Sequence, residues 1–252
     1  MNKKNVQLVW ELAKTDFKVR YQGSVFGYFW SLLKPLLIFA VLYTVFSVFI
    51  RWDVPNFQLH LLLGIIIWTF FADGTKAGLN SLMEKSGIIK KIYFPRILVV
   101  LSSVLSAFLT FLLNILIYFV FLFISGVGFY KWMIFIPFYL LLLFFLVFGF
   151  ALILSVLQSK YRDVTHIWDV LLQAGFFITP IIYPLSFVPE QFRSYLFINP
   201  LTGFIEYLRL LTINGELPSM YESLYMVGFI AVIMSFGLLI FNKLSFKVIE
   251  EL

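Results

Sequence analysis

The chain has 252 residues, of which 62% are hydrophobic and 13% are charged, and its formal net charge at pH 7 is +6. A soluble domain is about 45–50% apolar and about 25% charged, and its core could not hide this many apolar side chains. The composition therefore excludes an ordinary soluble domain and predicts an all-α integral membrane protein. Cysteine is absent, which excludes disulfides and thiolate chemistry.

Residues 3–22 have the pattern of an amphipathic helix. Apolar side chains recur at helical spacing, and lysines and other polar residues fill the opposite face. Tryptophan and lysines together are typical of a helix that lies in the cytoplasmic headgroup layer. Membrane anchoring is one interpretation, and a specific contact with a partner subunit or a lipid headgroup is the other. The apolar positions are Val6, Val9, Trp10, Ala13 and Phe17.

Six apolar segments follow, each able to cross a bilayer core of about 30 Å, which takes roughly 20 helical residues. The second is apolar from Gln58 to Ala72 and could continue to Leu82, in which case Asp73 and Lys76 must face protein or water. The expected spans cover 31–50, 58–82, 97–124, 132–157, 164–183 and 224–241.

The spans differ in how proline interrupts them. Lys34 and Pro35 fall in the first turn of the first span, where the missing N–H of proline costs no hydrogen bond. The fifth span is broken near its end by Pro180 and Pro184.

Six spans place both termini on one side of the membrane, and the positive charges indicate which side. Of the 19 lysines and arginines, only Arg51, Lys131, Arg193 and Arg209 fall on the side opposite the termini. Cytoplasmic loops carry the excess of lysine and arginine, so we expect both termini in the cytoplasm. The excess of positive charge is then explained by the orientation of the protein in the membrane, and we expect no nucleic-acid partner.

The second cytoplasmic loop, residues 83–96, is short and basic, yet it carries Ile88, Ile89, Tyr93 and Phe94. Apolar side chains on such a loop predict docking to a soluble partner. Packing on the lipid headgroups is the alternative.

The external segment 184–223 is too long for a plain connector. It predicts one short helix over 189–195 and a second that begins with Asn199 as N-cap and Pro200 at the first position. Gly215 is a plausible end for the second helix. Neither helix can span, so we expect both to re-enter the membrane or to lie over a pore mouth.

Motifs for chemistry are missing from the sequence. There is no Gly-x-x-x-x-Gly-Lys-Ser/Thr phosphate loop, so the chain does not bind ATP in that way. His60 and His166 stand alone, and no span carries a central pair of acids of the kind that a proton-coupled carrier needs. We therefore predict a permease with no catalytic residue, no metal site and no cofactor of its own.

Four segments of the chain carry a family resemblance. They are Arg20–Pro35 (RYQGSVFGYFWSLLKP), Lys90–Arg96 (KKIYFPR), Tyr161–Trp168 with Ile178–Pro184 (YRDVTHIW and ITPIIYP), and Asn199–Arg209 (NPLTGFIEYLR). Together, and in this order, they resemble the type-2 ABC exporter permeases for polysaccharides, the group that exports O-antigen and teichoic acid. The resemblance covers nearly the whole chain.

The resemblance implies a homodimer of permeases in the bacterial inner membrane, bound to two ATPase subunits that hold ATP and Mg. It implies a glycan on undecaprenyl pyrophosphate as cargo, with the first and fifth spans lining a channel between protomers. The amphipathic start would lie at the cytoplasmic interface. The loop at 83–96 would be the coupling helix, with Glu84, Ile88, Ile89, Lys90, Lys91 and Tyr93 as contacts. The external helices would form a gate, with Pro180, Pro184, Asn199, Pro200, Glu206 and Arg209 as its residues.

Residue types suggest how a glycan would be handled. Sugars present apolar C–H faces that stack on aromatic rings, although lipid-facing or core positions are the alternative in a chain that is 20% aromatic. A pyrophosphate would be drawn to cytoplasmic cations, for which membrane anchoring is the rival role. The candidate rings are Phe39, Tyr43 and Phe46, on about one face of the first span, and Phe176, Phe177 and Tyr183 in the fifth; the candidate cations are Lys18, Arg20 and Lys34.

Two other functions remain open from the sequence. A permease for a drug or another lipid would have the same topology. A membrane-embedded lipid-sugar transferase would need acids or a metal at a membrane boundary, where the sequence offers only the isolated Asp53, Asp163 and Glu190.

Overall fold

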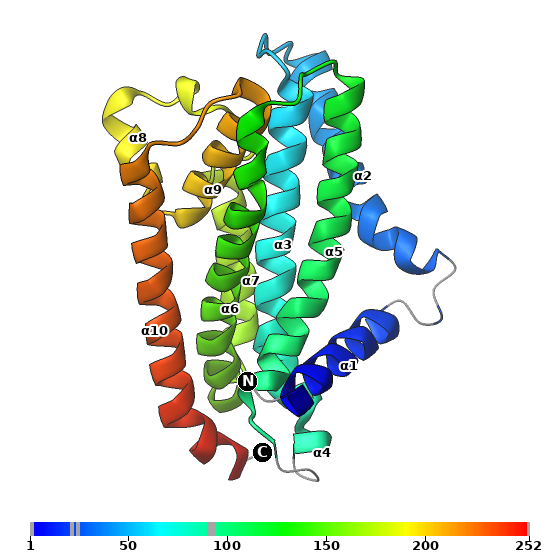
Figure 1. Cartoon of the computed structure of the whole chain (residues 1–252), viewed down its shortest axis with the longest axis vertical. Helices are drawn as coiled ribbons and strands as arrows, with labels where there is room; N and C mark the ends of the chain where they lie inside the picture. The colour runs from blue at the N-terminus through cyan, green and yellow to red at the C-terminus, as the bar shows by residue number, and fades with distance from the viewer. Residues whose placement is uncertain (1–2, 21–22, 24–25, 90–93, 251–252) are drawn as a thin grey trace.

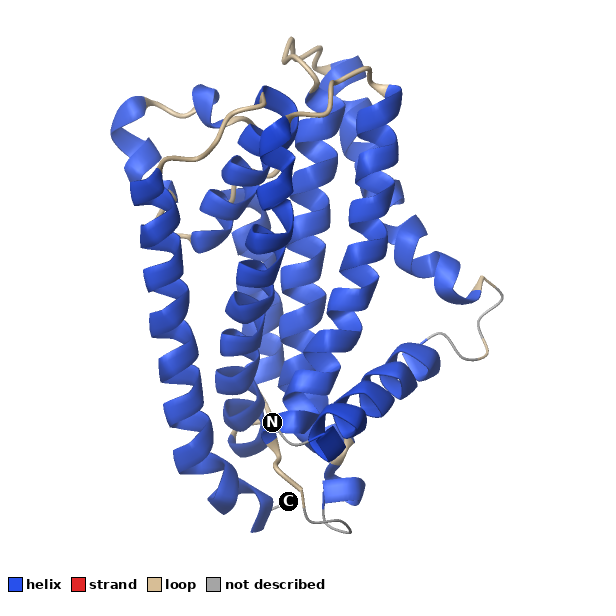
Figure 2. Ribbon diagram, in the orientation of Figure 1, coloured by secondary structure: helices blue, strands red, loops and turns tan. Residues whose placement is uncertain are grey.

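The computed structural model describes residues 3–20, 23, 26–89 and 94–250. They form a bundle of helices, with no strand in any described part of the chain (Figure 2). The long helices are α3 (Phe57–Glu84), α5 (Ile97–Ile124), α6 (Ile136–Lys160) and α10 (Met220–Glu250). The shorter elements are α1 (Lys3–Arg20), η1 (Gly27–Phe29), α2 (Trp30–Tyr43), η2 (Thr44–Phe49), α4 (Ser86–Ile89), η3 (Lys131–Phe135), α7 (Val164–Ile178), η4 (Leu185–Phe187), α8 (Glu190–Leu196), α9 (Pro200–Arg209) and η5 (Leu210–Asn214).

Helix α3 is the centre of the bundle and packs between α5 and α6 (Figure 1). Small residues on α3 make the contact with α6 close. A Cβ atom on Gly74 would lie 2.6 Å from Val147, and one on Gly78 would lie 2.3 Å from Ala151. Close approach through small residues is the usual way that membrane helices pack, so the small-residue stretch of the second expected span is an interface between helices.

Within the described residues, five helical segments are long and apolar enough to cross a membrane, or six if the bent pair formed by α8 with α9 and η5 counts as one span. The third expected span is confirmed at 97–124, and the second continues unbroken to Glu84. The first is α2 followed by the π-helical η2, and the fourth is η3 followed by α6. The sixth is longer at both ends than predicted, because α10 covers 220–250.

The helix of the fifth expected span, 164–183, begins at Val164 and ends just before Pro180, where the sequence predicted a break. Helix α7 has 15 residues and ends at Ile178, so it is about 22 Å long, less than the roughly 30 Å of a bilayer core. The helix stops because Thr179 precedes Pro180 and takes an extended conformation, with ψ 138°.

The two short helices expected within 184–223 are present as α8 and as α9 with η5, and they are bent by 108° relative to one another. Asn199 caps α9, Pro200 is its first residue, and Gly215 ends η5 in the left-handed conformation with φ 71°. Helix α9 lies among the upper ends of the long helices (Figure 1). The chain therefore turns back into the bundle after α7 instead of completing a fifth straight crossing.

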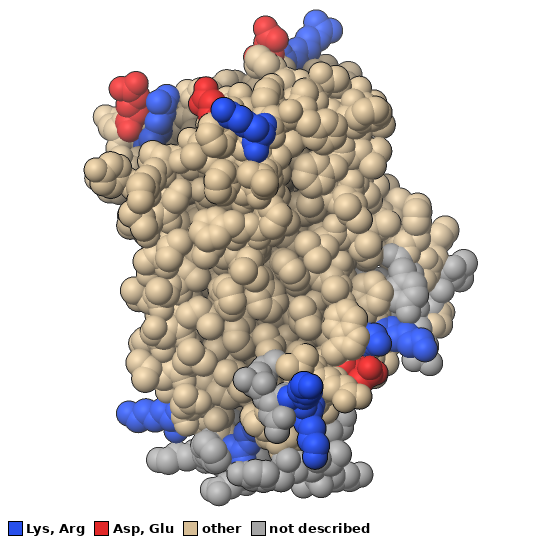
Figure 3. All heavy atoms as spheres, viewed as in Figure 1, with Lys and Arg blue, Asp and Glu red and all other residues tan. Residues whose placement is uncertain are grey.

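Charge is divided between the two ends of the bundle. Figure 3 shows lysine, arginine, aspartate and glutamate at both ends of one face, with an uncharged belt between them. Helices α1 and α4 and the C-terminal end of α10 lie at the same end (Figure 1). This arrangement fits a multi-pass membrane protein.

Candidate functional site

Two adjoining pockets lie between helices of the bundle: one of about 640 Å³ between α2, α3 and α5, and one of about 430 Å³ between α2, α3 and α7. Uncharged polar groups and aromatic rings line them as well, including Asn80, Gln173, Trp68 and Phe177. We call the pair the ion-pair groove and define it by its charged residues, Lys34, Asp73, Lys76 and Asp169, with the shared residues Ile38 and Thr69.

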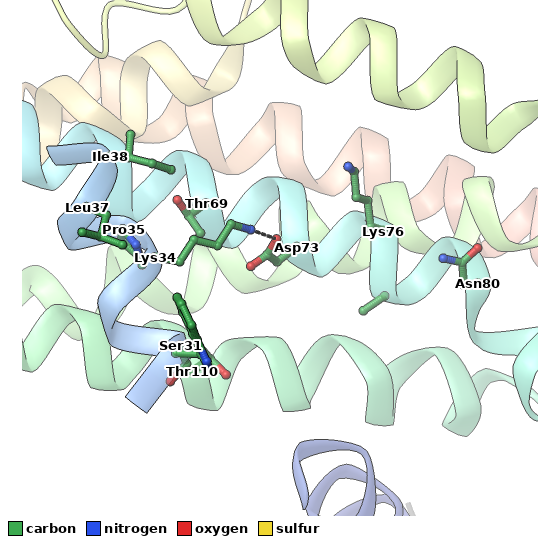
Figure 4. A pocket seen from close by; sticks show the side chains of 12 residues that line it. Ser31, Lys34, Pro35, Leu37, Ile38, Thr69, Asp73, Lys76, Asn80 and Thr110 are labelled. Carbon is green, nitrogen blue, oxygen red and sulfur yellow. Dashed lines mark hydrogen bonds and ion pairs between the residues drawn. The ribbon is translucent and has the colours of Figure 1, made fainter. Parts of the chain in front are cut away.

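Two ion pairs cross the groove. Lys34 Nζ of α2 lies 3.4 Å from Asp73 Oδ1 of α3, and Lys76 Nζ of α3 lies 2.6 Å from Asp169 Oδ1 of α7. Figure 4 shows Lys34 and Asp73 pointing toward one another, with Lys76 further along α3. Each of α2 and α7 is thus tied to α3 by one ion pair, and the charged lining sums to zero.

The ion pairs lie at membrane depth. Asp73 is about 16 Å along the α3 axis from Glu84, within a helix that is apolar enough to span. Ionisable groups at such depth are costly unless they are paired or face water, and they commonly mark a transport path. The four side chains keep between 36% and 59% exposure, so they line an opening and are not sealed inside the bundle.

Aromatic rings line the outer part of the groove. Phe176 packs edge-on against Trp68 at 6.0 Å between ring centroids, and Phe177 is 65% exposed. A Cβ atom on Gly175 would lie 2.8 Å from Trp68, so α7 packs closely on α3 here. The sequence placed Phe176 and Phe177 among the channel rings, and both line the groove; their contact with a glycan stays a prediction.

The three candidate rings of the first span share a face, but in this chain that face packs against protein. Phe39 stacks on Tyr43 at 5.5 Å and meets Phe121 of α5 at 5.7 Å, while Tyr43 also stacks on Phe57. Phe46 packs on Trp52 at 4.7 Å. These contacts favour core packing, the alternative that the sequence left open, over glycan stacking.

Tyr183, the sixth candidate ring, has a different neighbour. Its hydroxyl donates to the Ile178 carbonyl oxygen at 2.8 Å. Tyr183 therefore satisfies a carbonyl at the end of α7, where helical partners are missing.

The three candidate cations do not meet. Lys18 is exposed on α1, the side chain of Arg20 lies outside the described part of the structure, and Lys34 pairs with Asp73. No contact joins Lys18 to Lys34 among the described side chains. The sequence shows Asp73 and Lys76 as charges that must face protein or water, but no pattern in it marks them, or Asp169, as parts of a site.

The candidate gate residues form a second polar cluster at the outer end. Arg209 is 2% exposed and is paired with Glu206 at 2.6 Å. Its guanidinium also donates to three carbonyl oxygens, those of His60, Pro180 and Ile181, at 2.9–3.0 Å. This cluster, the Arg209 hub, fixes the chain after α7 to both α3 and α9.

Asn199 supports the hub from the start of α9. Its Oδ1 accepts from the Leu201 backbone N–H at 3.1 Å, and its Nδ2 donates to Thr179 Oγ1 at 2.7 Å. Pro200 is the first residue of α9, and Pro184 directly precedes η4. The proline and asparagine positions that suggested a gate therefore shape the turn from α7 into α9.

At the opposite end, α4 follows α3 directly, and Glu84 is exposed at the end of α3. The other predicted coupling contacts, namely the side chains of Ile88 and Ile89 and the residues Lys90, Lys91 and Tyr93, lie outside the described residues.

Next to α4, Lys85 joins α1 to α5. Its Nζ contacts the Asp16 carboxylate and lies 3.2 and 3.1 Å from the hydroxyl oxygens of Ser102 and Ser103. Ala13 of α1 is fully buried one turn away. The sequence missed this contact, because Asp16 and Lys85 are 69 residues apart and no local pattern links them.

Comparison with known proteins gives a consistent family. Residues 7–213 match the model of the ABC-2 type transporter family. The chain is 37% identical to the O-antigen export system permease protein RfbA of Klebsiella pneumoniae, over 96% of this chain and 93% of that protein. It is 25% identical to RfbA of Myxococcus xanthus, over 84% and 82% of the two chains.

A more distant relative is the polysialic acid transport protein KpsM of Escherichia coli, which is 24% identical over 90% of this chain and 89% of that protein. Since the family model covers most of the chain and one relative exceeds a third identity along almost all of it, the chain belongs to the ABC-2 type transporter family, as a membrane permease that works with a separate ATPase.

Proposed function

We propose that the chain is the permease of an exporter for a lipid-linked polysaccharide of the O-antigen type, carried on undecaprenyl pyrophosphate. Two copies of the chain and two ATPase subunits make up the transporter, and the glycan leaves the cytoplasm between the two permeases. The observation that carries this proposal is the ion-pair groove, which places paired charges at membrane depth between α2 and α7. The O-antigen names of the relatives support the same cargo.

The groove favours a polar cargo over the drug or lipid alternative. A site for an apolar molecule is lined mostly by apolar and aromatic side chains with few polar groups. Here two lysines and two aspartates stand in the lining, with Asn80 and Gln173 beside them. Sugar hydroxyls can use all of these groups, whereas an apolar drug would leave them without partners.

Each part of the chain has a role in this proposal. Both termini are cytoplasmic, and the end that holds α1 and α4 meets the ATPase through Glu84, Ile88, Ile89, Lys90, Lys91 and Tyr93. Phe176 and Phe177 stack on sugar rings. Lys18, Arg20 and Lys34 are the candidates for the pyrophosphate, and Lys34 must leave Asp73 to reach it. The Arg209 hub, with Pro180, Pro184, Asn199, Pro200 and Glu206, supports the outer gate.

The test is deletion of the gene for this chain in its own bacterium. We expect surface polysaccharide to disappear and lipid-linked glycan to accumulate inside the cell, and a plasmid copy of the gene to reverse both effects. Normal surface glycan in the deletion strain would overturn the proposal. Susceptibility to drugs, measured in the same strains, separates this function from drug export.

A further inference from the structure

The ion-pair groove has as many positive as negative side chains. This equality bears on which class of glycan the groove can accept. Among the residues that line the two pockets, the charged ones are Lys34, Asp73, Lys76 and Asp169. Each lysine is paired with one aspartate. A lining built to attract a polyanion would instead carry an excess of lysine or arginine.

We propose that the ion-pair groove is a charge-balanced sugar site that accepts uncharged glycan repeats and disfavours acidic ones. The proposal rests on the proposed function, because it assumes that a polysaccharide passes along α2 and α7. It adds to that function the chemical class of the glycan repeat. It also assigns the selection between neutral and acidic repeats to the four charged residues of the groove.

Hydrogen-bond chemistry explains why paired charges suit a neutral sugar. A hydroxyl both donates and accepts, an ammonium only donates, and a carboxylate only accepts. Each lysine–aspartate pair therefore offers both kinds of partner to neighbouring hydroxyls of one sugar ring. The side chains are partly exposed, and Lys34 Nζ lies 3.4 Å from Asp73 Oδ1, so hydroxyls can take up these bonds without uncovering a fully buried charge.

The same residues disfavour an acidic repeat. A carboxylate on each sugar would meet Asp73 and Asp169 as well as the lysines, and like charges placed together discriminate against the wrong ligand. This repulsion is stronger beside the apolar walls of the bundle than in water. The lysines cannot offset it fully, because each is already paired with an aspartate of the groove.

The test uses the complete transporter, permease with its ATPase, in cells that lack their own exporter. Two glycans are built on the same undecaprenyl carrier and to the same length, one with glucose in each repeat and the other with glucuronate. Surface glycan of each kind is quantified, and the amount of assembled transporter is measured for every variant. The quantity compared is the ratio of neutral to acidic export.

We expect wild-type protein to export the glucose glycan in large excess. Combining Asp73→Asn with Asp169→Asn removes the repulsive groups and leaves both lysines uncompensated, so the ratio should fall about tenfold or more. Exchanging the charges with Lys76→Asp and Asp169→Lys restores the balance, and the ratio should stay near that of wild type. Asp53→Asn removes a carboxylate from an exposed outer loop, and it should leave the ratio unchanged.

Two results would overturn the proposal, and they differ in whether the proposed function survives. Equal export of both glycans by wild type, with no shift in the double variant, removes the charge-balanced site and leaves the proposed function intact. Export of neither glycan by a transporter that is fully assembled overturns the proposed function and the charge-balanced site with it.

Discussion

At the outer end of the bundle the Arg209 guanidinium is 2% exposed and makes four hydrogen bonds, whereas Lys34 and Lys76 in the ion-pair groove are about half exposed and each meet one carboxylate. Both regions place charge among apolar helices. The buried arginine holds backbone carbonyls, so its bonds fix structure. The groove lysines are partly exposed, so under the proposed function we expect their bonds to pass to a cargo. Burial and partner type thus separate a structural cation from a functional one.

The largest effect should come from breaking the Arg209 hub. Arg209→Ala removes the group that donates to Glu206 and to three carbonyl oxygens in a buried site, and losing one partner of a buried pair costs about 3–5 kcal/mol. We expect little assembled permease in membranes and a clearly lower Tm in detergent.

Arg193→Ala is the matched control for the hub. This arginine of α8 is 39% exposed, meets Glu190 at 4.0 Å and donates to the carbonyl oxygens of Val188 and Ser186 at 2.9 and 3.4 Å. Because its side chain is exposed, its loss should lower Tm much less than the loss of Arg209. A Tm for Arg209→Ala equal to that of the control would contradict the structural role of the hub.

A smaller effect should follow at the opposite end, where Asp16 and Lys85 are also mostly buried, with 23% and 11% of their side chains exposed. Asp16→Asn removes the charge that Lys85 meets and should cost about 1–3 kcal/mol. We expect a lower Tm together with easier proteolysis of α1. Glu11→Gln is the control, since its pair with Lys14 is exposed; equal behaviour of the two variants would show that the Lys85 contact does not hold α1.

In the groove, a substitution should affect export more than stability, which is the reverse of the Arg209 hub. Lys76→Gln breaks a half-exposed pair with Asp169, and such pairs contribute at most about 1 kcal/mol to stability. We expect near-normal assembly and Tm but reduced surface glycan. Loss of assembly as severe as in Arg209→Ala would place Lys76 with the structural cations and remove the distinction between the two regions.

The smallest effect concerns an exposed ring. Phe177→Ala should leave stability almost unchanged and slow export by a few fold, as expected for the loss of one sugar-stacking contact, which is worth about 1 kcal/mol. Phe123→Ala is the control, because Phe123 of α5 is 71% exposed and does not line the groove. Equal export rates for the two variants would count against stacking at Phe177.

Long uninterrupted apolar runs made the spans predictable, and 97–124 was placed to the residue. Local sequence patterns also predicted structure where they depend on backbone hydrogen bonds and dihedral angles. Asn199 and Pro200, for example, begin α9 as expected. A break in the fifth span near Pro180 was also predicted, but the last helical residue was not, because hydropathy continues past Thr179 although the backbone before Pro180 could not stay helical.

The site was harder to predict because its contacts are distant in sequence. Lys34 and Asp73 are 39 residues apart, and their meeting depends on how α2 packs on α3. Helical spacing correctly put Phe39, Tyr43 and Phe46 on one face, but it cannot say which neighbour that face meets. The signal that was present, charges inside an apolar run, pointed to Asp73 and Lys76 without showing their partners.

The close packing at Gly74 and Gly78 has a mechanical consequence. Helices α3 and α6 touch almost backbone to backbone there. In their most apolar stretches 67% and 72% of the residues are buried, against 11% in the stretch formed by α2 and η2. The two central helices therefore form the closely packed centre of the bundle. Helix α2 is held to this centre by the replaceable ion pair between Lys34 and Asp73. If a passage opens beside the two central helices, we expect α2 to move and the central pair to stay in place.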